Sequence, residues 1–184
     1  MRISDDRYRR DQQRLDVAVH FIEHEARTQT IRRWTGLSDD RIRKLYRSYL
    51  SGHAGGLPTR HRGKSPQQAA HFTRTAQLRQ EAALLASLYL LAGVLPATVS
   101  EPRGTPDIPR ARLLCLAYDT YRALTLQPRI SFEHAVFLVT ALGRGDEVQL
   151  SECSHCAAVV VADRLSLRVP QCAACSAAPG QAPH

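Results

Sequence analysis

Two Cys-x-x-Cys pairs near the end of the chain constrain its fold more than any other feature of the sequence. Cys153 and Cys156 form the first pair, and Cys172 and Cys175 form the second after fifteen intervening residues. Each pair can turn two thiolates toward one metal ion, and this separation is typical of tetrahedral zinc sites. Because four thiolates saturate the ion and leave no open position for water, we predict one structural Zn²⁺ per chain.

The segment between the two pairs predicts the form of the metal-binding module. Residues 159–161 and 165–169 are rich in β-prone side chains, and Asp163-Arg164 between them suits a turn. We therefore expect a hairpin inside a zinc ribbon or knuckle over residues 150–176. His155 lies within the first pair, where we expect a solvent-facing spacer because four cysteines already complete the site.

The alternative use of the four cysteines is two disulfide bonds in a secreted domain. Disulfides persist in oxidising compartments, and the first residues of the chain, Met1 to Asp6, carry charges instead of the apolar core of a signal peptide. We therefore favour metal over disulfides. The fifth cysteine, Cys115, lies in an apolar run far from the pairs, where a small buried thiol is expected.

Basic residues gather in the first third of the chain. Residues 1–64 hold 15 Lys and Arg against 8 Asp and Glu, whereas residues 65–184 hold 10 against 9. A clustered positive charge attracts polyanions such as nucleic acid. We therefore expect a polyanion partner for the first third, although nearly all of its basic residues are Arg, which a bias in codon composition would also produce.

Residues 28–50 have the pattern of a helix-turn-helix. Ile31, Gly36 and Ile42 fall at the offsets of an apolar contact from the first helix, a turn glycine, and an apolar contact from the second. A serine suited to N-capping and two acidic residues predict that the second helix begins at about Asp39. The predicted buried stripe of this helix is Ile42, Leu45, Tyr46 and Tyr49.

The outer face of the second helix is basic, as docking in the major groove of DNA requires. The glycine-rich loop over residues 52–66 is also basic and can lie along a phosphate backbone. The candidate DNA-binding residues of the helix, its N-cap and the loop are Ser38, Arg41, Arg43, Lys44, Arg47, Arg60, Arg62 and Lys64. The alternative is that these charges form the solvated face of an amphipathic helix.

The remaining segments predict a mainly α-helical fold. Apolar residues at helical spacing, with prolines and capping residues at the ends, indicate helices over residues 7–27, 72–95, 110–126 and 131–142. Ser131 and Gly143 are the expected caps of the last one. The expected organisation is a helical region with the helix-turn-helix and basic loop over residues 1–66, a helical core over 67–146, and a small four-cysteine zinc module with a disordered tail over 147–184.

One uncharged stretch, residues 82–100, approaches the length of a membrane span. Pro96 interrupts it and leaves a helix too short to cross a bilayer, so we expect a core helix and no membrane association. Large apolar side chains point in almost every direction around the axis of this helix: Leu84, Leu85, Leu88, Tyr89, Leu90 and Leu91. Such a helix is usually enclosed on every side. We expect a partner protein to supply part of the enclosure, unless the N-terminal helix folds over it and completes a single core.

The sequence contains one motif that is known from enzymes, but the match rests only on the spacing of three residues. His20, Glu23 and His24 match the H-x-x-E-H pattern of inverted zinc peptidases. The sequence marks out no downstream acidic ligand, and two exposed histidines on a polar helix face explain the pattern as well. The chain has no glycine-rich phosphate loop and no G-x-S-x-G elbow. We therefore expect neither an enzyme nor a small-molecule substrate.

In their order along the chain, these motifs resemble the FlhC family, subunits of the bacterial flagellar transcription activator. The matching stretches are Ala26-Arg27-Thr28-Gln29, Gly36-Leu37-Ser38, Ile42-Arg43-Lys44-Leu45-Tyr46, Gly55-Gly56-Leu57-Pro58 and the two cysteine pairs. The resemblance implies a cytoplasmic DNA-binding subunit that assembles with an FlhD-like protein into a hetero-oligomer. It also implies zinc bound by the four cysteines and activation of flagellar operons at promoter DNA, with RNA polymerase as a further partner. A zinc-ribbon adaptor that binds only proteins is the alternative.

Overall fold

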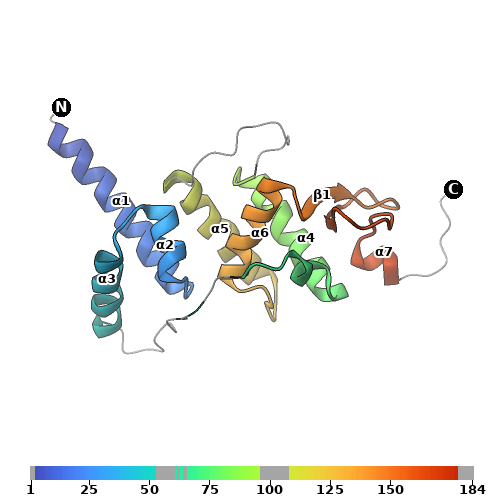
Figure 1. Ribbon diagram of the computed structural model, residues 1–184, viewed down its shortest axis with the longest axis horizontal. Helices are drawn as coiled ribbons and strands as arrows, with labels where there is room; N and C mark the ends of the chain where they lie inside the picture. Colours follow the sequence, from blue (N-terminus) through green and yellow to red (C-terminus); the bar gives the residue numbers. More distant parts are fainter. Residues whose placement is uncertain (1–2, 53–60, 62, 64–65, 96–107, 178–184) are drawn as a thin grey trace. The chain divides into compact units, whose positions relative to one another are not determined.

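The computed structural model describes residues 3–52, 61, 63, 66–95 and 108–177. Its elements are, in chain order, α1 (Ile3–Glu23), α2 (Thr28–Thr35), α3 (Asp39–Gly52), the 3-10 helix η1 (Ala69–Thr73), α4 (Ala76–Leu91), α5 (Ile108–Leu124), α6 (Phe132–Arg144), β1 (Val148–Glu152), β2 (Val159–Asp163) and α7 (Ala173–Ala177) (Figure 1). The expected mainly helical fold is confirmed. The chain divides into two compact units, residues 1–65 with 104–115 and residues 66–103 with 116–184, so α5 contributes to both.

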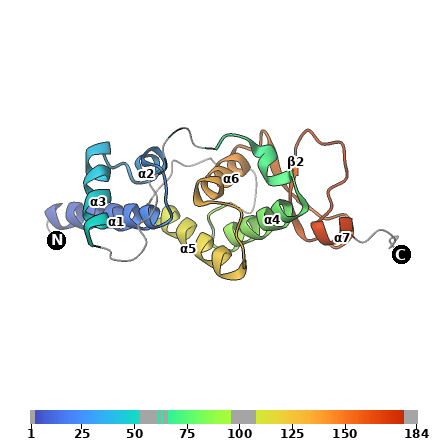
Figure 2. The ribbon, with the colours of Figure 1, turned by 90° about the horizontal axis from the view of Figure 1, so that it is seen from below.

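Helices α1, α2 and α3 pack together in the first unit (Figure 2). They share one apolar core. Phe21 of α1, Trp34 of α2 and Ile42 of α3 are all buried, and the rings of Phe21 and Trp34 lie 6.3 Å apart. The hydroxyl of Tyr46 donates a hydrogen bond to the carbonyl oxygen of Ala26, which ties α3 to the segment between α1 and α2. These contacts fix which face of α3 points outward.

The first helix begins and ends earlier than predicted. We expected residues 7–27, whereas α1 spans Ile3–Glu23. Just after it, Glu25 adopts a left-handed φ of 58°, and the amide of Ala26 donates to the carbonyl of Phe21 at 2.8 Å. This backward hydrogen bond is that of a Schellman motif, which closes a helix even without glycine. The periodic apolar pattern that continues to residue 26 therefore belongs partly to the turn.

Gly36 makes the turn between α2 and α3. Its φ is 70°, and its N–H donates to the carbonyl of Arg32 at 2.8 Å, so it caps α2 in the left-handed conformation that glycine adopts without strain. Leu37 follows and is buried. Helix α3 then begins at Asp39, as predicted. Of the predicted stripe, Ile42 and Tyr46 are buried and Leu45 is half-buried, while the side chain of Tyr49 lies outside the described part of the chain.

The second unit is built on α4, α6 and the later part of α5. Large apolar side chains that are fully buried form its core: Phe72, Leu85, Tyr89, Tyr121, Ile130 and Phe132. The Tyr89 hydroxyl donates to the carbonyl of Ala135 at 3.0 Å, and this bond joins α4 to α6. Apolar burial and a few directed hydrogen bonds thus hold the three helices together.

A buried polar network crosses this core. The carboxylate of Glu81 accepts hydrogen bonds from the hydroxyl of Tyr121 and, at 2.8 Å, from the backbone N–H of Arg129. The Tyr121 hydroxyl in turn accepts from the backbone N–H of Ile130 at 3.2 Å. Burial, followed by the hydrogen bond with Glu81, raises the pKa of Tyr121. One tyrosine therefore connects α4, α5 and the loop that leads to α6.

Two helix ends in this unit differ from the prediction. We expected one helix over residues 72–95, but Phe72 lies in η1 and α4 begins only at Ala76, because Thr75 is extended and its hydroxyl caps the amide of Leu78 at 3.1 Å. Helix α6 has the predicted N-cap, Ser131, but the C-cap is Gly145 and not Gly143. Gly145 has a φ of 64° and donates to Ala141, whereas Gly143 lies inside the helix.

The predicted hairpin is wrong in its pairing. Residues 165–169 form no strand, and β2 pairs with β1, which precedes the first cysteine pair (Figure 1). The pairing is antiparallel, with Leu150 opposite Val161. After β2 the chain turns away, because the amide of Leu165 bonds to the side chain of Asp163 at 2.8 Å. The apolar side chains that we assigned to the second strand, Leu165, Leu167 and Val169, are left exposed.

The apolar surface of α4 is only partly enclosed within this chain. Leu85 and Tyr89 are fully buried, Leu84 and Leu88 are half-buried, and Leu91 is 84% exposed. Among the described helices, none combines the length and the apolar character needed to cross a membrane. At the end of the chain, Ser176 and Ala177 belong to α7, while the rest of the predicted disordered tail, residues 178–184, lies outside the described residues.

Candidate metal centre and basic helix face

The first cysteine pair lies at the tip of the β1–β2 hairpin. Cys153 follows β1 directly, and its N–H donates to the carbonyl of Ala158 at 2.8 Å. Ala157 then adopts a φ of 56° and donates back to the carbonyl of Cys153 at 2.9 Å. This tight loop points both thiols of the pair to one side of the hairpin. The hairpin that we missed is thus the element that presents Cys153 and Cys156.

The second pair lies at the start of α7. Cys172 immediately precedes the helix and its carbonyl accepts the N–H of Ser176 at 3.0 Å, while Cys175 lies within the helix. Two bonds hold this segment against the hairpin tip: Ser154 N–H donates to the carbonyl of Pro170 at 3.0 Å, and Cys172 N–H donates to the sulfur of Cys153 at 3.3 Å. These two bonds, one to a backbone carbonyl and one to a cysteine sulfur, hold the two pairs close together.

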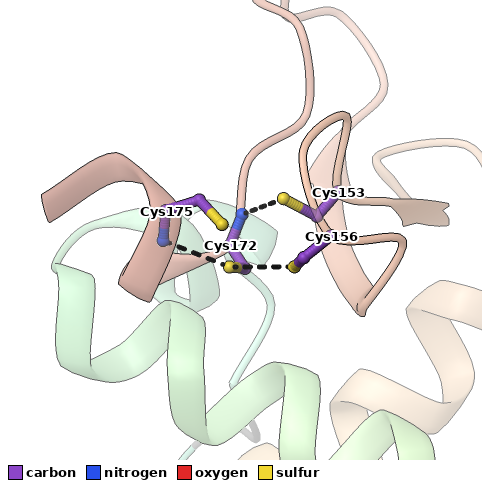
Figure 3. Close-up of side chains that lie close together, drawn as sticks. All are labelled: Cys153, Cys156, Cys172 and Cys175. Atoms are coloured by element: carbon purple, nitrogen blue, oxygen red, sulfur yellow. Dashed lines mark hydrogen bonds between the residues drawn. The ribbon is translucent and has the colours of Figure 1, made fainter. Parts of the chain in front are cut away.

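The four sulfur atoms converge on one point (Figure 3). All of them lie within 4.8 Å of one another, and the sulfurs of Cys156 and Cys172 are 3.7 Å apart. A tetrahedral ion with metal–sulfur bonds of about 2.3 Å requires sulfur–sulfur edges of about 3.8 Å, which this pair already meets. None of the five cysteines forms a disulfide, and the 3.7 Å between the sulfurs of Cys156 and Cys172 far exceeds an S–S bond. The cluster can hold a metal ion.

The electrostatics of the cluster also favour a cation. The N–H of Cys172, donating to the Cys153 sulfur, lowers the pKa of Cys153 to about 6. By contrast, the hydrogen bond with Cys172 and the neighbouring thiols raise the pKa of Cys175 to about 12. Cys153 therefore ionises readily, whereas the hydrogen bonds around Cys175 oppose its ionisation. A bound dication favours the ionised form of all four groups, because it compensates the charge of the thiolates.

The remaining cysteine and histidine predictions concern groups outside the cluster. Cys115 is buried, as predicted. His155 is exposed, and its ring nitrogen Nε2 lies 2.9 Å from the amide nitrogen of Gln171, so it meets the expectation of a solvent-facing spacer. Within the described residues, the four cysteines are the one set of three or more His, Cys, Asp or Glu ligands that converges. His20, Glu23 and His24 do not form such a set.

The outward face of α3 carries the candidate DNA contacts. These residues differ in whether their side chains already pair with a carboxylate. Arg41 donates two hydrogen bonds, at 2.7 and 2.8 Å, to the carboxylate of Asp11 on α1. Arg43 pairs with Asp40 at 3.0 Å. Lys44 and Arg47 are exposed, and no acidic group among the described residues pairs with either of them.

Sequence reasoning missed the partner of Arg41. The hydrogen bonds from the Arg41 guanidinium lower the pKa of the Asp11 carboxyl. Asp11 lies thirty residues away in the sequence, so no short-range sequence pattern predicts the pair. Because its guanidinium is held on α1, Arg41 is less available to DNA than its neighbours on α3.

The other predicted contacts are only partly described. Ser38 is exposed just before α3. Arg60, Arg62 and Lys64 of the predicted basic loop lie outside the described residues. Between them, His61 is described, and its Nε2 lies 3.0 Å from the carboxylate of Glu25. The structure thus places the helix candidates together on α3 and leaves the loop candidates as predictions.

Comparisons with known proteins do not assign the chain to a family. The sequence matches no model of a known protein family, and a search of curated proteins finds no match.

Proposed function

We propose that this chain is the DNA-binding subunit of a transcription activator. The observation that carries the proposal is the outward face of α3, where Lys44 and Arg47 are exposed without an acidic partner on a helix whose opposite face is anchored by buried Ile42 and Tyr46. A rigidly held helix with a basic outer face suits the major groove. In this proposal Lys44 and Arg47 contact DNA directly, and Arg41 positions α3 through Asp11.

We further propose that the four cysteines bind one structural zinc ion. The donor set consists of thiolates only, and soft thiolates in a tetrahedral arrangement select zinc or iron–sulfur chemistry. Four sulfurs converging from two Cys-x-x-Cys pairs support a single ion with a closed coordination sphere. Such an ion would crosslink the hairpin tip to α7 and so stabilise the end of the chain.

The resemblance to the FlhC family supplies the biological context of the proposal. We propose that the chain acts in the cytoplasm with an FlhD-like protein in a hetero-oligomer, and that the complex recruits RNA polymerase to flagellar operons. The exposed apolar residue Leu91 and the half-buried leucines of α4 support a partner protein, because exposed apolar surface of this kind promotes association.

The decisive experiment compares variants of the co-expressed complex on DNA. Duplexes selected from a random library by the wild-type complex serve as the probe, and affinity is measured by fluorescence anisotropy. Lys44→Ala and Arg47→Ala should each weaken binding by about 1 to 3 kcal/mol where the residue meets a base edge, and by less where it meets phosphate. Arg122→Ala, an exposed arginine on α5, is the matched control and should change little.

A protein-binding adaptor is the second candidate. The exposed apolar residues Leu165, Leu167 and Val169 favour it, because they offer a contact surface for another protein. A selection that yields no DNA sequence would support the adaptor, and wild-type affinity of the Lys44→Ala/Arg47→Ala double variant for a selected duplex would reject DNA reading by α3.

A further inference from the structure

A hollow in the second unit lies beside β2 and next to the second cysteine pair, since Gln171 and Ser176 line it. It has a volume of about 380 Å³ and is bounded by β2, by the chain from 166 to 171, and by the region where η1 leads into α4. Hollows of this size are typical of binding sites for small ligands or for a few residues of a peptide. None of the residues proposed to read DNA lines it.

Two arginines without acidic partners line the hollow. Arg79 is half-buried and donates a long hydrogen bond of 3.4 Å to the carbonyl of Thr73, and Arg168 is exposed. In the described part of the chain, neither guanidinium pairs with a carboxylate. The one carboxylate in the lining, Asp163, accepts the N–H of Leu165 at 2.8 Å. The hollow is therefore complementary to an anionic group.

The backbone of β2 adds a second, directional feature. The bonds that join Cys153 to Ala158 and Arg164 to Glu147 set the alternation of the ladder, so that Val161 directs its N–H and C=O away from β1. Val161 lines the hollow, and no described residue bonds to these two groups. A free donor and acceptor on an edge strand match the main chain of an extended peptide.

Apolar side chains are exposed in the chain that borders the hollow. Val169 lines the hollow and is 67% exposed, and Leu165 and Leu167, in the segment that precedes it, are 85% and 102% exposed. A phosphate backbone gains nothing from apolar side chains, whereas a peptide with acidic and apolar residues would use both the arginines and this apolar surface.

We propose that this hollow binds an extended, acidic segment of a partner protein. Carboxylates of the segment pair with Arg79 and Arg168, its main chain meets Val161, and its apolar side chains contact Val169 and the exposed leucines that precede Val169 in the chain. Arginine is suited to this task because its planar guanidinium binds a carboxylate through two parallel hydrogen bonds. The proposal does not depend on DNA binding by α3.

The test measures binding of defined peptides to the full, metal-loaded chain, co-expressed with its partner if the chain requires one. The probe is a fluorescein-labelled, capped octapeptide of four Leu-Asp repeats, followed by fluorescence anisotropy. We expect the Leu-Asp peptide to bind saturably. A peptide of four Leu-Ser repeats should bind at least about tenfold more weakly. Arg79→Gln/Arg168→Gln should weaken binding of the Leu-Asp peptide about tenfold or more, and Arg122→Gln, the matched control, should change it less than about twofold.

A single substitution keeps the test valid if the double variant is unstable. Arg168 is exposed, so Arg168→Gln should fold normally and still weaken binding by about threefold or more. No saturable binding of the Leu-Asp peptide, or equal binding by wild type and Arg168→Gln, would overturn the proposal. Displacement of the peptide by inorganic phosphate or oligothymidylate at similar concentration would also overturn it, because the hollow would then be a general anion site.

Discussion

Replacing Tyr121 with Phe tests whether the buried network holds the second unit together. The substitution keeps the ring, which is fully buried, and removes only the hydroxyl. That hydroxyl donates to Glu81 and accepts from the backbone N–H of Ile130 at 3.2 Å. Its removal takes one bond from a buried carboxylate and leaves the N–H of a buried residue without a partner.

The expected loss of stability follows from these two bonds. A lost hydrogen bond costs about 1 kcal/mol, and a buried donor left unsatisfied costs about 1 to 3 kcal/mol. We therefore expect Tyr121→Phe to lower the free energy of unfolding of the second unit by about 2 to 4 kcal/mol. The control, Thr120→Ala, removes a hydroxyl from the adjacent position that bonds only within α5, to the carbonyl of Leu116 at 2.8 Å. It should cost less than about 1 kcal/mol.

Urea unfolding of the full chain, followed by tyrosine fluorescence and circular dichroism, measures both variants. Because Glu81 and Tyr121 interact directly, a double-mutant cycle of Glu81→Gln with Tyr121→Phe should give a coupling energy of about 1 kcal/mol or more. If Tyr121→Phe is no less stable than Thr120→Ala, the network does not stabilise the unit and the reasoning fails.

Three further predictions concern the metal centre, the α1–α3 ion pair and the turn. Freshly purified, reduced protein should hold one zinc per chain, and its removal by a chelator should unfold the hairpin tip and α7, as seen by hydrogen exchange; elemental analysis without zinc would reject this. Because Arg41 lowers the pKa of Asp11, the stability that this pair contributes is present above the unfolded pKa, near 3.8, and is lost as the pH falls through the lower folded value. Asp11→Asn should thus melt below wild type at pH 7 and approach wild type as the pH falls below 3.8, and a constant difference in melting temperature at all pH values would contradict the pairing. In Gly36→Ala the added Cβ atom has no other atom within 4 Å, but alanine is forced to a φ of 70°. This substitution should therefore destabilise the first unit by about 1 kcal/mol, whereas Gly143→Ala, inside α6, should not destabilise the protein.

Local signals in the sequence predicted the parts of the fold that local physics determines. The acidic residues at the start of α3 and the glycine before it fixed the position of that helix, and the spacing of the four cysteines predicted their cluster. Ser131 also capped α6 as expected. In each of these cases the responsible groups lie within a few residues of one another or repeat at a diagnostic spacing.

The errors arose where two local solutions compete. Residues 165–169 have the β-propensity of a strand, but hydrogen bonds to Asp163 turn the chain just after β2, and the strand that pairs with β2 is β1, joined to it by the tight loop at the first cysteine pair. Gly143 and Gly145 both suit a helix end, and only the helix length selects Gly145. The pair of Asp11 with Arg41 depends on how α1 and α3 pack, which no short pattern encodes.

The salt dependence of DNA affinity tests the central proposal most directly. Each phosphate contact releases counterions, so the slope of log affinity against log salt concentration changes by about 0.9 per contact. If Lys44 and Arg47 both contact the phosphate backbone, the Lys44→Ala/Arg47→Ala complex should show a slope about 1.8 smaller in magnitude than that of wild type. A slope unchanged from wild type, together with wild-type affinity for the selected duplex, would contradict DNA binding by the outward face of α3.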